Sequence, residues 1–440
     1  MKQLPKLLIS SLVTLTAFPG LTMGADLLGL YKKAENYDAN IFAAKSAYLA
    51  EREGENIAFG QLLPSINASA SVNHTDTDRE GLPDDSYKTR AYSVSLSQPL
   101  LNFNSWYNVS AAEQSTLRAE TTYLAAQQGL ILDVSSAYFG VLRTEENLRS
   151  AKSQEAAVKR QYEQAKEQFD VGLIAITDVH EAKASYDASQ TFRIRSEGDL
   201  TVARENLSRI TGEYANQLDT LKSDFPISMD KNTSAEQWAE SASQNNLNIK
   251  IAEFALKSVD ANLNASRSGH YPTLSLDAGY NNNEFSNRAS AFNINPPKTT
   301  NIALTLNVPL YSGGATQAGV RKTRHLVEQA RQQLTSAQRQ AQIEVRTEYI
   351  NLKTNIQTVD SLQQNIVSRQ SALEATREGY NVGTRNIVEV LDAERNYFTA
   401  LRDYANARFD FVESNLRIKR SAGTLSVVDI EILNEWLVAE

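Results

Sequence analysis

The chain of 440 residues contains no cysteine. This absence excludes disulfide bonds, thiolate metal sites, cysteine nucleophiles and the attachment of a lipid to an N-terminal cysteine. Histidine is also scarce, and the four histidines lie far apart at His74, His180, His270 and His325. His180-Glu181 lacks the second histidine of an HExxH helix. We therefore expect no metal site.

Catalytic and nucleotide-binding motifs are missing as well. No Gly-x-Ser-x-Gly elbow occurs, and Gly314-Ala-Thr-Gln-Ala-Gly319 continues as Val-Arg rather than as the Gly-Lys-Thr of a phosphate loop. Lys and Arg total 44 against 52 Asp and Glu, so the formal net charge is −8. Nucleic-acid binding needs clustered positive charge, which is not visible here. The sequence therefore predicts no enzyme activity, no cofactor and no nucleic-acid partner.

Long hydrophobic runs occur only at the N-terminus. Lys2 and Lys6 precede an apolar stretch from Leu7 to Phe18, and Met23-Gly24-Ala25 provides a small-residue exit. The apolar core of roughly 12 residues is short for a membrane helix, which needs about 20. We interpret residues 1–25 as a secretory signal peptide, with a retained anchor helix as the alternative. An exported chain without a later apolar helix could enter a membrane only as β-strands.

Four short segments alternate between apolar and polar residues, which predicts strands with one apolar and one polar face. The first has Ile66 to Val72 alternating with serine and asparagine, and the second centres on Val94 and ends at Pro99. The third follows Tyr271-Pro272, and the fourth, around Leu304, ends at Pro309. One loop is expected from His74 to about Thr89, between the first two strands. A second loop is expected after the third strand and reaches Lys298. Each strand is expected to be about 10 residues long, enough to span a bilayer when tilted.

The rest of the chain is helical in composition. Asp26 to about Gln61 predicts one helix, and Asn104 to Phe169 contains no proline, which predicts roughly 100 Å of continuous helix. Further helices are expected over 178–210, up to Arg267, over 315–380 and over 386–422. In the long second-half helix, Val345, Tyr349, Leu352, Ile356 and Val359 are spaced alternately by four and three residues. Such lengths and spacing indicate coiled coils.

The chain is internally duplicated. Phe169-Asp-Val-Gly-Leu-Ile-Ala-Ile-Thr-Asp-Val179 returns as Tyr380-Asn-Val-Gly-Thr-Arg-Asn-Ile-Val-Glu-Val390, and 383 − 172 equals 423 − 212, which is 211. The two proline landmarks give similar offsets, because 272 − 64 is 208 and 309 − 99 is 210. We therefore predict structural repeats over 26–222 and 237–440, joined by a linker over 223–236.

Four strands cannot close a barrel, and lipid does not tolerate open sheet edges. Several chains must then share one barrel: two would give eight strands, and three would give twelve with room for a lumen. We favour three. The fold class is thus a mixed α/β membrane protein in which a 12-stranded β-barrel continues into a helical coiled-coil barrel. The alternatives are a soluble hairpin layer packed on helices, and an exported structural coiled-coil or adhesin-type surface protein.

The sequence resembles the TolC family of outer-membrane channel proteins. The residues that carry the resemblance are the two tip motifs Val171–Val179 and Val382–Asp392, together with Leu63-Pro-Ser65, Tyr271-Pro-Thr273, Val308-Pro-Leu-Tyr-Ser-Gly-Gly314 and Leu416–Leu425. The resemblance implies a homotrimer in the outer membrane of a Gram-negative bacterium, with a long periplasmic part. It also implies an exit duct for drugs or secreted proteins. Such a duct serves inner-membrane transporters of the RND, ABC or MFS type through periplasmic adaptor proteins.

The resemblance also assigns roles to the tip residues. Glu389 and Asp392 share a helix face and match the selective, constricting gate ring, in which three copies would present 3 × 2 = 6 carboxylates. Thr177, Asp178, Tyr380 and Arg385 match the latch that holds the inner coiled coil shut. Gly172 and Gly383 mark the turns that adaptors would grip. Two departures are visible: Glu389 stands where the family more often has Asp, and Pro99-Leu-Leu-Asn-Phe103 lacks the Gly-Gly that follows Pro309.

Overall fold

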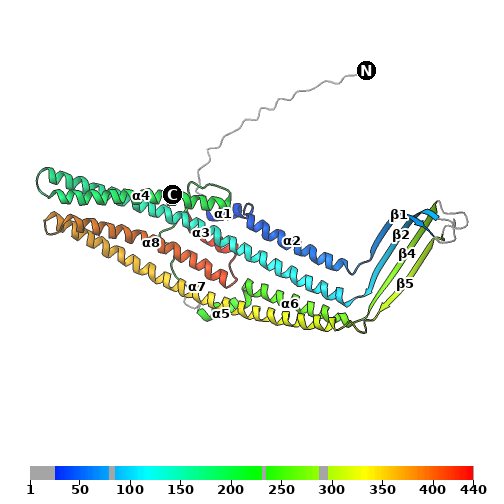
Figure 1. The fold of residues 1–440 in the computed structure, drawn as a ribbon. Coiled ribbons are helices and arrows are strands. Elements are labelled where there is room, and N and C mark those ends of the chain that lie inside the picture. The colour runs from blue at the N-terminus through cyan, green and yellow to red at the C-terminus, as the bar shows by residue number, and fades with distance from the viewer. Residues whose placement is uncertain (1–24, 79–84, 230–233, 287–295, 440) are drawn as a thin grey trace, which may run out of the picture.

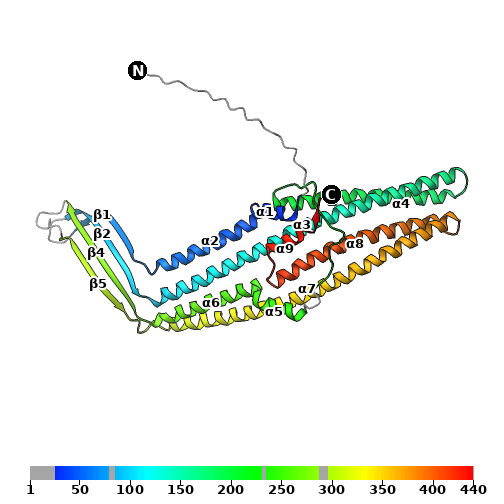
Figure 2. The ribbon, with the colours of Figure 1, turned by 180° about the vertical axis from the view of Figure 1, so that it is seen from behind.

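The computed structural model describes residues 25–78, 85–229, 234–286 and 296–439. The predicted signal peptide, residues 1–25, lies outside these ranges except for its last residue. The chain forms a long rod with a four-stranded sheet at one end and two helical hairpins at the other (Figure 1). Short elements gather around the middle of the rod, which we call the waist: α1, α5, α9 and the β3–β6 pair (Figure 2).

Long helices run from the sheet to the hairpin tips. The helices of the first half are α1 (Leu27–Glu35), α2 (Ala39–Gly60), α3 (Phe103–Asp170) and α4 (Ile176–Thr211). Those of the second half are α5 (Ala235–Asn245), α6 (Leu247–Arg267), α7 (Ala315–Asn381), α8 (Ile387–Ser421) and α9 (Val427–Asn434). Helix α3 has 68 residues and α7 has 67, which confirms the two long helices predicted from composition. The predicted seam of α7 is also confirmed, because Val345, Leu352 and Val359 are buried.

The prediction of one helix from Asp26 to Gln61 was wrong, because the chain breaks between α1 and α2. Asp38 has an extended backbone and caps α2 by accepting hydrogen bonds from the backbone N–H groups of Asn40 and Ile41. Asn246 caps α6 in the same way and divides it from α5. An Asx side chain at a helix start accepts hydrogen bonds from N–H groups that have no partner within the helix, and it thereby stabilises the new start. Both breaks let the chain turn at the waist.

The sheet contains β1 (Ser65–Thr77), β2 (Asp85–Leu101), β4 (Thr273–Ser286) and β5 (Thr299–Asn307), all antiparallel and in the order β1-β2-β4-β5. The pairing of β2 with β4 joins the two halves of the chain. The predicted loops were too long, since His74 to Thr77 is paired with β2 and β4 continues to Ser286. Strand β2 also passes Pro99, where the register with β4 shifts by a bulge. A bulge accommodates proline because proline has no N–H to donate.

The register aligns the apolar residues of all four strands on one face. Ile66 is paired with Leu96, Leu96 with Ala278, and Ala278 with Ile302. The alternate rows are polar, for example Asn67 with Ser95. Ile66 and Ile302 are 68% and 76% exposed. An apolar face of this kind left open on a sheet indicates contact with lipid or protein.

The main apolar core lies at the waist and holds α1, α3, α4, α8 and α9 together. Tyr138 of α3 is fully buried there and donates a hydrogen bond to the backbone carbonyl of Asp219. Helix α9 and the β3–β6 pair (Thr220–Leu221 with Leu437–Val438) were not predicted. The Ser426–Asp429 capping box was the available signal for α9. In the described parts of the chain, no helix has both the length and the apolar character to cross a membrane.

Candidate gate at the hairpin tips

Each helical hairpin reverses at a glycine in the left-handed region. Gly172 has φ +78° in the α3–α4 tip, and Gly383 has φ +77° in the α7–α8 tip. The two turns use the same hydrogen bond, from Leu173 N to Gln168 O and from Thr384 N to Gly379 O, each 2.8 Å long. A residue with a Cβ would be strained at such a φ, so these positions favour glycine.

The tips present apolar side chains to solvent. Val171, Leu173 and Val382 flank the two glycines and are 71%, 74% and 73% exposed. A Cβ built on Gly172 or Gly383 would meet no atom within 4 Å, so the surface beside both turns is open. The tips can therefore be reached by another protein.

The predicted gate-ring carboxylates lie in the first turns of α8, and each is paired with an arginine of the same helix end. Glu389 Oε2 is 2.5 Å from Arg385 Nη1, and Asp392 Oδ1 is 2.8 Å from Arg395 Nη2. The backbone N–H of Glu389 donates to the N-cap Asn386. A predicted latch residue, Arg385, is thus bound within the protomer to a predicted ring residue.

The predicted latch residue Tyr380 joins the two hairpins. Its hydroxyl donates to Gln168 Oε1 of α3 over 2.8 Å. Burial raises the pKa of Tyr380 above its ordinary value, and the nearby negative charge of Asp178 raises it further. In the described parts of the chain, Thr177 and Asp178 form no hydrogen bond or ion pair with Tyr380 or Arg385. The structure therefore brings Tyr380 near Asp178 but gives its hydroxyl a different acceptor.

A small apolar cluster supports these polar contacts. Val158 and Ala165 of α3, Ala182 of α4, and Ile387 and Leu391 of α8 are buried together. The start of α8 therefore packs into the groove between the two helices of the first hairpin. This packing and the Tyr380–Gln168 hydrogen bond hold the second hairpin against the first.

Two residues near the tip were missed from the sequence. Glu394 of α8 has a fully buried side chain, and its Oε1 lies 2.5 Å from Nη2 of Arg377 on α7. Burial raises the pKa of Glu394, although the charges of Arg377 and Arg160 oppose that shift. In the sequence Asp392-Ala-Glu-Arg395, Glu394 has the composition of a solvated face, so nothing local indicated its burial.

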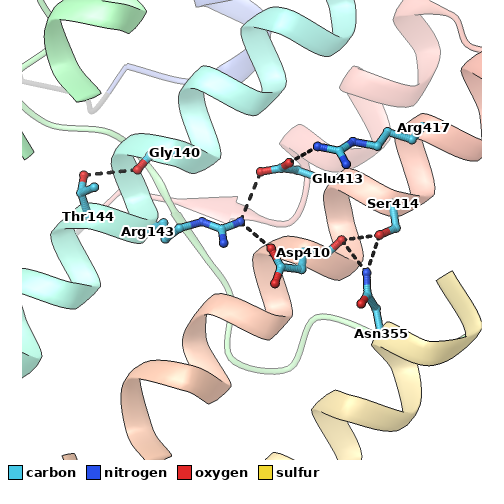
Figure 3. Close-up of polar contacts among 8 residues, drawn as sticks. All are labelled: Gly140, Arg143, Thr144, Asn355, Asp410, Glu413, Ser414 and Arg417. Atoms are coloured by element: carbon cyan, nitrogen blue, oxygen red, sulfur yellow. Dashed lines mark hydrogen bonds and ion pairs between the residues drawn. The ribbon is translucent and has the colours of Figure 1, made fainter. Parts of the chain in front are cut away.

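A second charged cluster lies closer to the waist and joins three helices (Figure 3). Arg143 of α3 contacts Asp410 at 2.7 Å and Glu413 at 3.4 Å, both on α8. Glu413 also pairs with Arg417 at 3.0 Å. On the other side of α8, Asn355 of α7 donates to Ser414 Oγ and to the backbone carbonyl of Asp410 (Figure 3). Burial raises the pKa of Glu413, and its two arginines oppose the shift.

Replacing Arg143 by Ala should destabilise the protein. The change leaves Glu413, whose side chain is 13% exposed, without its inter-helix partner. A buried charged group that loses a partner costs about 1–3 kcal/mol. We expect a lower midpoint of thermal unfolding, measured by circular dichroism in detergent. Arg331→Ala removes an exposed ion pair with Glu328 and serves as the control, with an expected change within about 0.5 kcal/mol. Equal effects of the two changes would contradict the role of the cluster.

A sheet with one open apolar face, continued by a rod of helices that ends in two hairpin tips, defines the chain as a channel protein of the outer membrane. Comparisons with known proteins agree. The sequence model of the outer membrane efflux protein family matches residues 30–213 and again residues 238–424. The outer membrane protein TolC of Vibrio cholerae is 34% identical over 440 residues, which cover 99% of this chain and 98% of that protein. The chain belongs to the outer membrane efflux protein family, the family of TolC.

Two further similarities cover most of the chain. The proteases secretion protein PrtF of Dickeya chrysanthemi is 26% identical over 96% of this chain and 94% of its own length. The crystal structure of the Campylobacter jejuni CmeC outer membrane channel superposes with a TM-score of 0.78 at 17% identity, over 99% of this chain and 98% of that chain. The second similarity supports the fold. The protein is located in the outer membrane of Gram-negative bacteria.

Proposed function

We propose that three copies of this chain close into one duct that carries drugs or secreted proteins out of the cell. The observation that carries the proposal is the sheet, whose outer strands β1 and β5 each have one edge without a partner in the described part of the chain. An open edge with an apolar face is unstable in lipid, so the edges must pair with other copies. Three copies of four strands give twelve, enough to enclose a lumen.

The outermost helices of the rod support the same assembly. Helix α2 leads into the edge strand β1, and α7 follows the edge strand β5. These helices therefore lie at the two edges of the protomer (Figure 1). Phe42, Leu49 and Ile57 are exposed along α2, and Ile343 and Ile350 are exposed along α7. Spacings of seven and eight residues put such side chains on one stripe of a helix. Neighbouring copies would bury these stripes as they join their sheets.

The junction between sheet and helices has the composition of a membrane boundary. The rings of Phe103, Trp106 and Tyr271 pack edge to face there. Leu310 and Tyr311, just after β5, are 92% and 87% exposed. Aromatic residues favour the interface between lipid and water. We infer that outer-membrane lipid surrounds the apolar face of the sheet from this level outward.

The tips give the duct its periplasmic end. Adaptor proteins would grip the exposed surface around Gly172 and Gly383, and they would connect the duct to an inner-membrane transporter of the RND, ABC or MFS type. The efflux description of the family supports drugs as cargo, and the protease-secretion name of one relative supports proteins. The chain would carry out no catalysis itself.

The same proposal includes the gate. Glu389 and Asp392 would form the ring, and Thr177, Asp178, Tyr380 and Arg385 would form the latch. Since no hydrogen bond or ion pair joins Thr177 or Asp178 to Arg385 within the described part of the chain, we infer that the neighbouring copy completes the latch. The ion pairs of both ring residues with Arg385 and Arg395 support a ring of mixed charge.

We further propose that the two halves, 26–222 and 237–440, are structural repeats joined by the linker 223–236. The two separate matches of one family model support this division. The glycines that follow α4 and α8 support it as well, because Gly212 packs against Tyr37 at the first helix break and Gly423 packs against Asn245 at the second.

The assembly is tested by two measurements on purified protein. Size-exclusion chromatography with light scattering in detergent should give the mass of three chains, and heating should convert the trimer to monomers on a gel. Insertion into a planar bilayer should then give discrete conductance steps. A monomer without conductance would contradict the proposal and would favour the interpretation as a structural coiled-coil protein.

Leu304→Lys should reduce assembly in the membrane. Leu304 lies on the apolar face of β5 and is 64% exposed, so the proposal gives it a lipid contact. A lysine facing lipid costs about 2–4 kcal/mol near the bilayer midplane. The control is Asn301→Lys on the polar face of the same strand, which would face the lumen. The amount of heat-modifiable trimer in outer-membrane fractions should fall for Leu304→Lys and not for the control. Equal trimer yields would contradict the lipid-facing assignment.

A further inference from the structure

Glu394 is the most completely buried carboxylate of the described residues, and its hydrogen bonding is incomplete. Its side chain is 0% exposed, and only Oε1 has a partner, Arg377. Glu394 Oε2 and Arg377 Nε find no hydrogen-bond partner among the described residues. A half-satisfied buried carboxylate is costly, because desolvation is not repaid in full. The packing of the helices in this structure therefore contains an unfavourable contact.

Because of the position of Glu394, the cost of desolvating its carboxylate depends on whether the two hairpins stay together. Leu391, three residues earlier on the same face of α8, packs with Val158 of α3 and Ala182 of α4. The positive charge of Arg160 of α3 acts on Glu394 as well, and a cleft between the hairpins is lined by Arg160, Arg377 and Tyr380. The carboxylate thus lies where the second hairpin meets the first. Separation of the hairpins would hydrate it.

Arg377 has a different environment from its partner. Its side chain is 41% exposed, so water can solvate the guanidinium even when Glu394 is absent. The pair is therefore asymmetric. Loss of Arg377 leaves a buried charge unpaired, whereas loss of the charge on Glu394 leaves an arginine that is already half hydrated.

We propose that Glu394 and Arg377 are positioning residues that set the balance of the gate: the buried carboxylate favours opening, and Arg377 makes the closed arrangement tolerable. Arg377 also lies one turn before Tyr380 on α7, so its contact with Glu394 orients the face that carries the Tyr380–Gln168 hydrogen bond. The inference rests on the proposed trimeric duct and names two residues that the resemblance does not assign to the latch or the ring.

The experiment uses the full chain as a trimer in lipid nanodiscs, with one spin label on each copy at Val382→Cys. The chain has no other cysteine, and Val382 is 73% exposed, so each label is unique and accessible. Distances among the three labels report how far the tips have separated. Arg377→Ala should increase the widely separated fraction at least about tenfold, because removing one partner of a buried pair is strongly unfavourable. Glu394→Gln should not increase it, and the double variant should return to the closed distribution.

The outcomes separate the alternatives. If Arg377→Ala and Glu394→Gln both open the tips, the pair is a simple clamp and the proposal is overturned. If neither changes the distances, it is overturned as well. Should Arg377→Ala fail to assemble, assembly of the double variant supports the proposal, and its failure to assemble contradicts it. A wild-type sample that is not trimeric refutes the proposed function itself, whereas a closed wild-type trimer with the wrong variant pattern refutes this inference alone. Arg331→Ala controls for the loss of an exposed arginine.

Discussion

Tyr380→Phe combined with Arg385→Ser should leave the closed channel leaky. The first change removes the 2.8 Å hydrogen bond from α7 to Gln168 of α3, and the second removes the predicted contact with the neighbouring copy together with the ion pair to Glu389. A hydrogen bond is worth about 1 kcal/mol, so its loss in three chains shifts the gate by about 3 kcal/mol, or roughly a hundredfold.

Planar-bilayer recording measures this effect directly. The double variant should show a larger single-channel conductance and a higher open fraction, and cells that express it should become sensitive to large antibiotics. The single variant Arg331→Ser, which keeps Tyr380, controls for the loss of one arginine. A double variant that stays tightly closed would argue against the latch and would leave the apolar cluster of Ile387 and Leu391 as the main closing contact.

Glu389→Ala combined with Asp392→Ala should raise the conductance and abolish block by multivalent cations. The two carboxylates lie three residues apart on α8, so three copies would place six of them around the axis. Each carboxylate is paired with an arginine, Arg385 or Arg395, at 2.5 or 2.8 Å. Removing the acids leaves these arginines behind. The ring of mixed charge then becomes positive, and its ion selectivity should shift towards anions.

Reversal potentials in a salt gradient measure that change. Glu389→Gln with Asp392→Asn keeps the size of the side chains and removes only their charge, so it should also shift the selectivity towards anions, with a smaller rise in conductance. Unchanged selectivity and unchanged block in both double variants would show that these residues do not face the conduction path.

Much of the fold followed from local patterns. Alternation around Val94 and Leu304 predicted strands with one apolar face, and the register of the sheet confirms that face. Gly172 and Gly383 predicted the two reversals because only glycine adopts their φ without strain. Strand ends were less accurate, since β-pairing continued into polar segments such as His74–Thr77 once the partner strand was present.

The contacts at the candidate gate were predictable only in part. Glu389 and Asp392 lie in the tip motif that carries the resemblance to the family, and Tyr380 lies just before that motif. Gln168 and Arg377 carry no such signal. The partner of Tyr380 is 212 residues away in sequence, and Arg377 meets Glu394 only because α7 and α8 fold back on each other. Arg143 meets Asp410 and Glu413 across a comparable separation (Figure 3).

The sequence by itself determined the elements of this protein: two long helical hairpins with glycine turns, four amphipathic strands and the family to which they belong. These features depend on backbone conformation and on the alternation of side chains, which neighbouring residues control. Only the tertiary structure decided which charges are buried and with which partners. Burial of Glu394 and Glu413 depends on helices brought together from distant parts of the chain, and the cost of desolvating a charge exists only after those helices have packed.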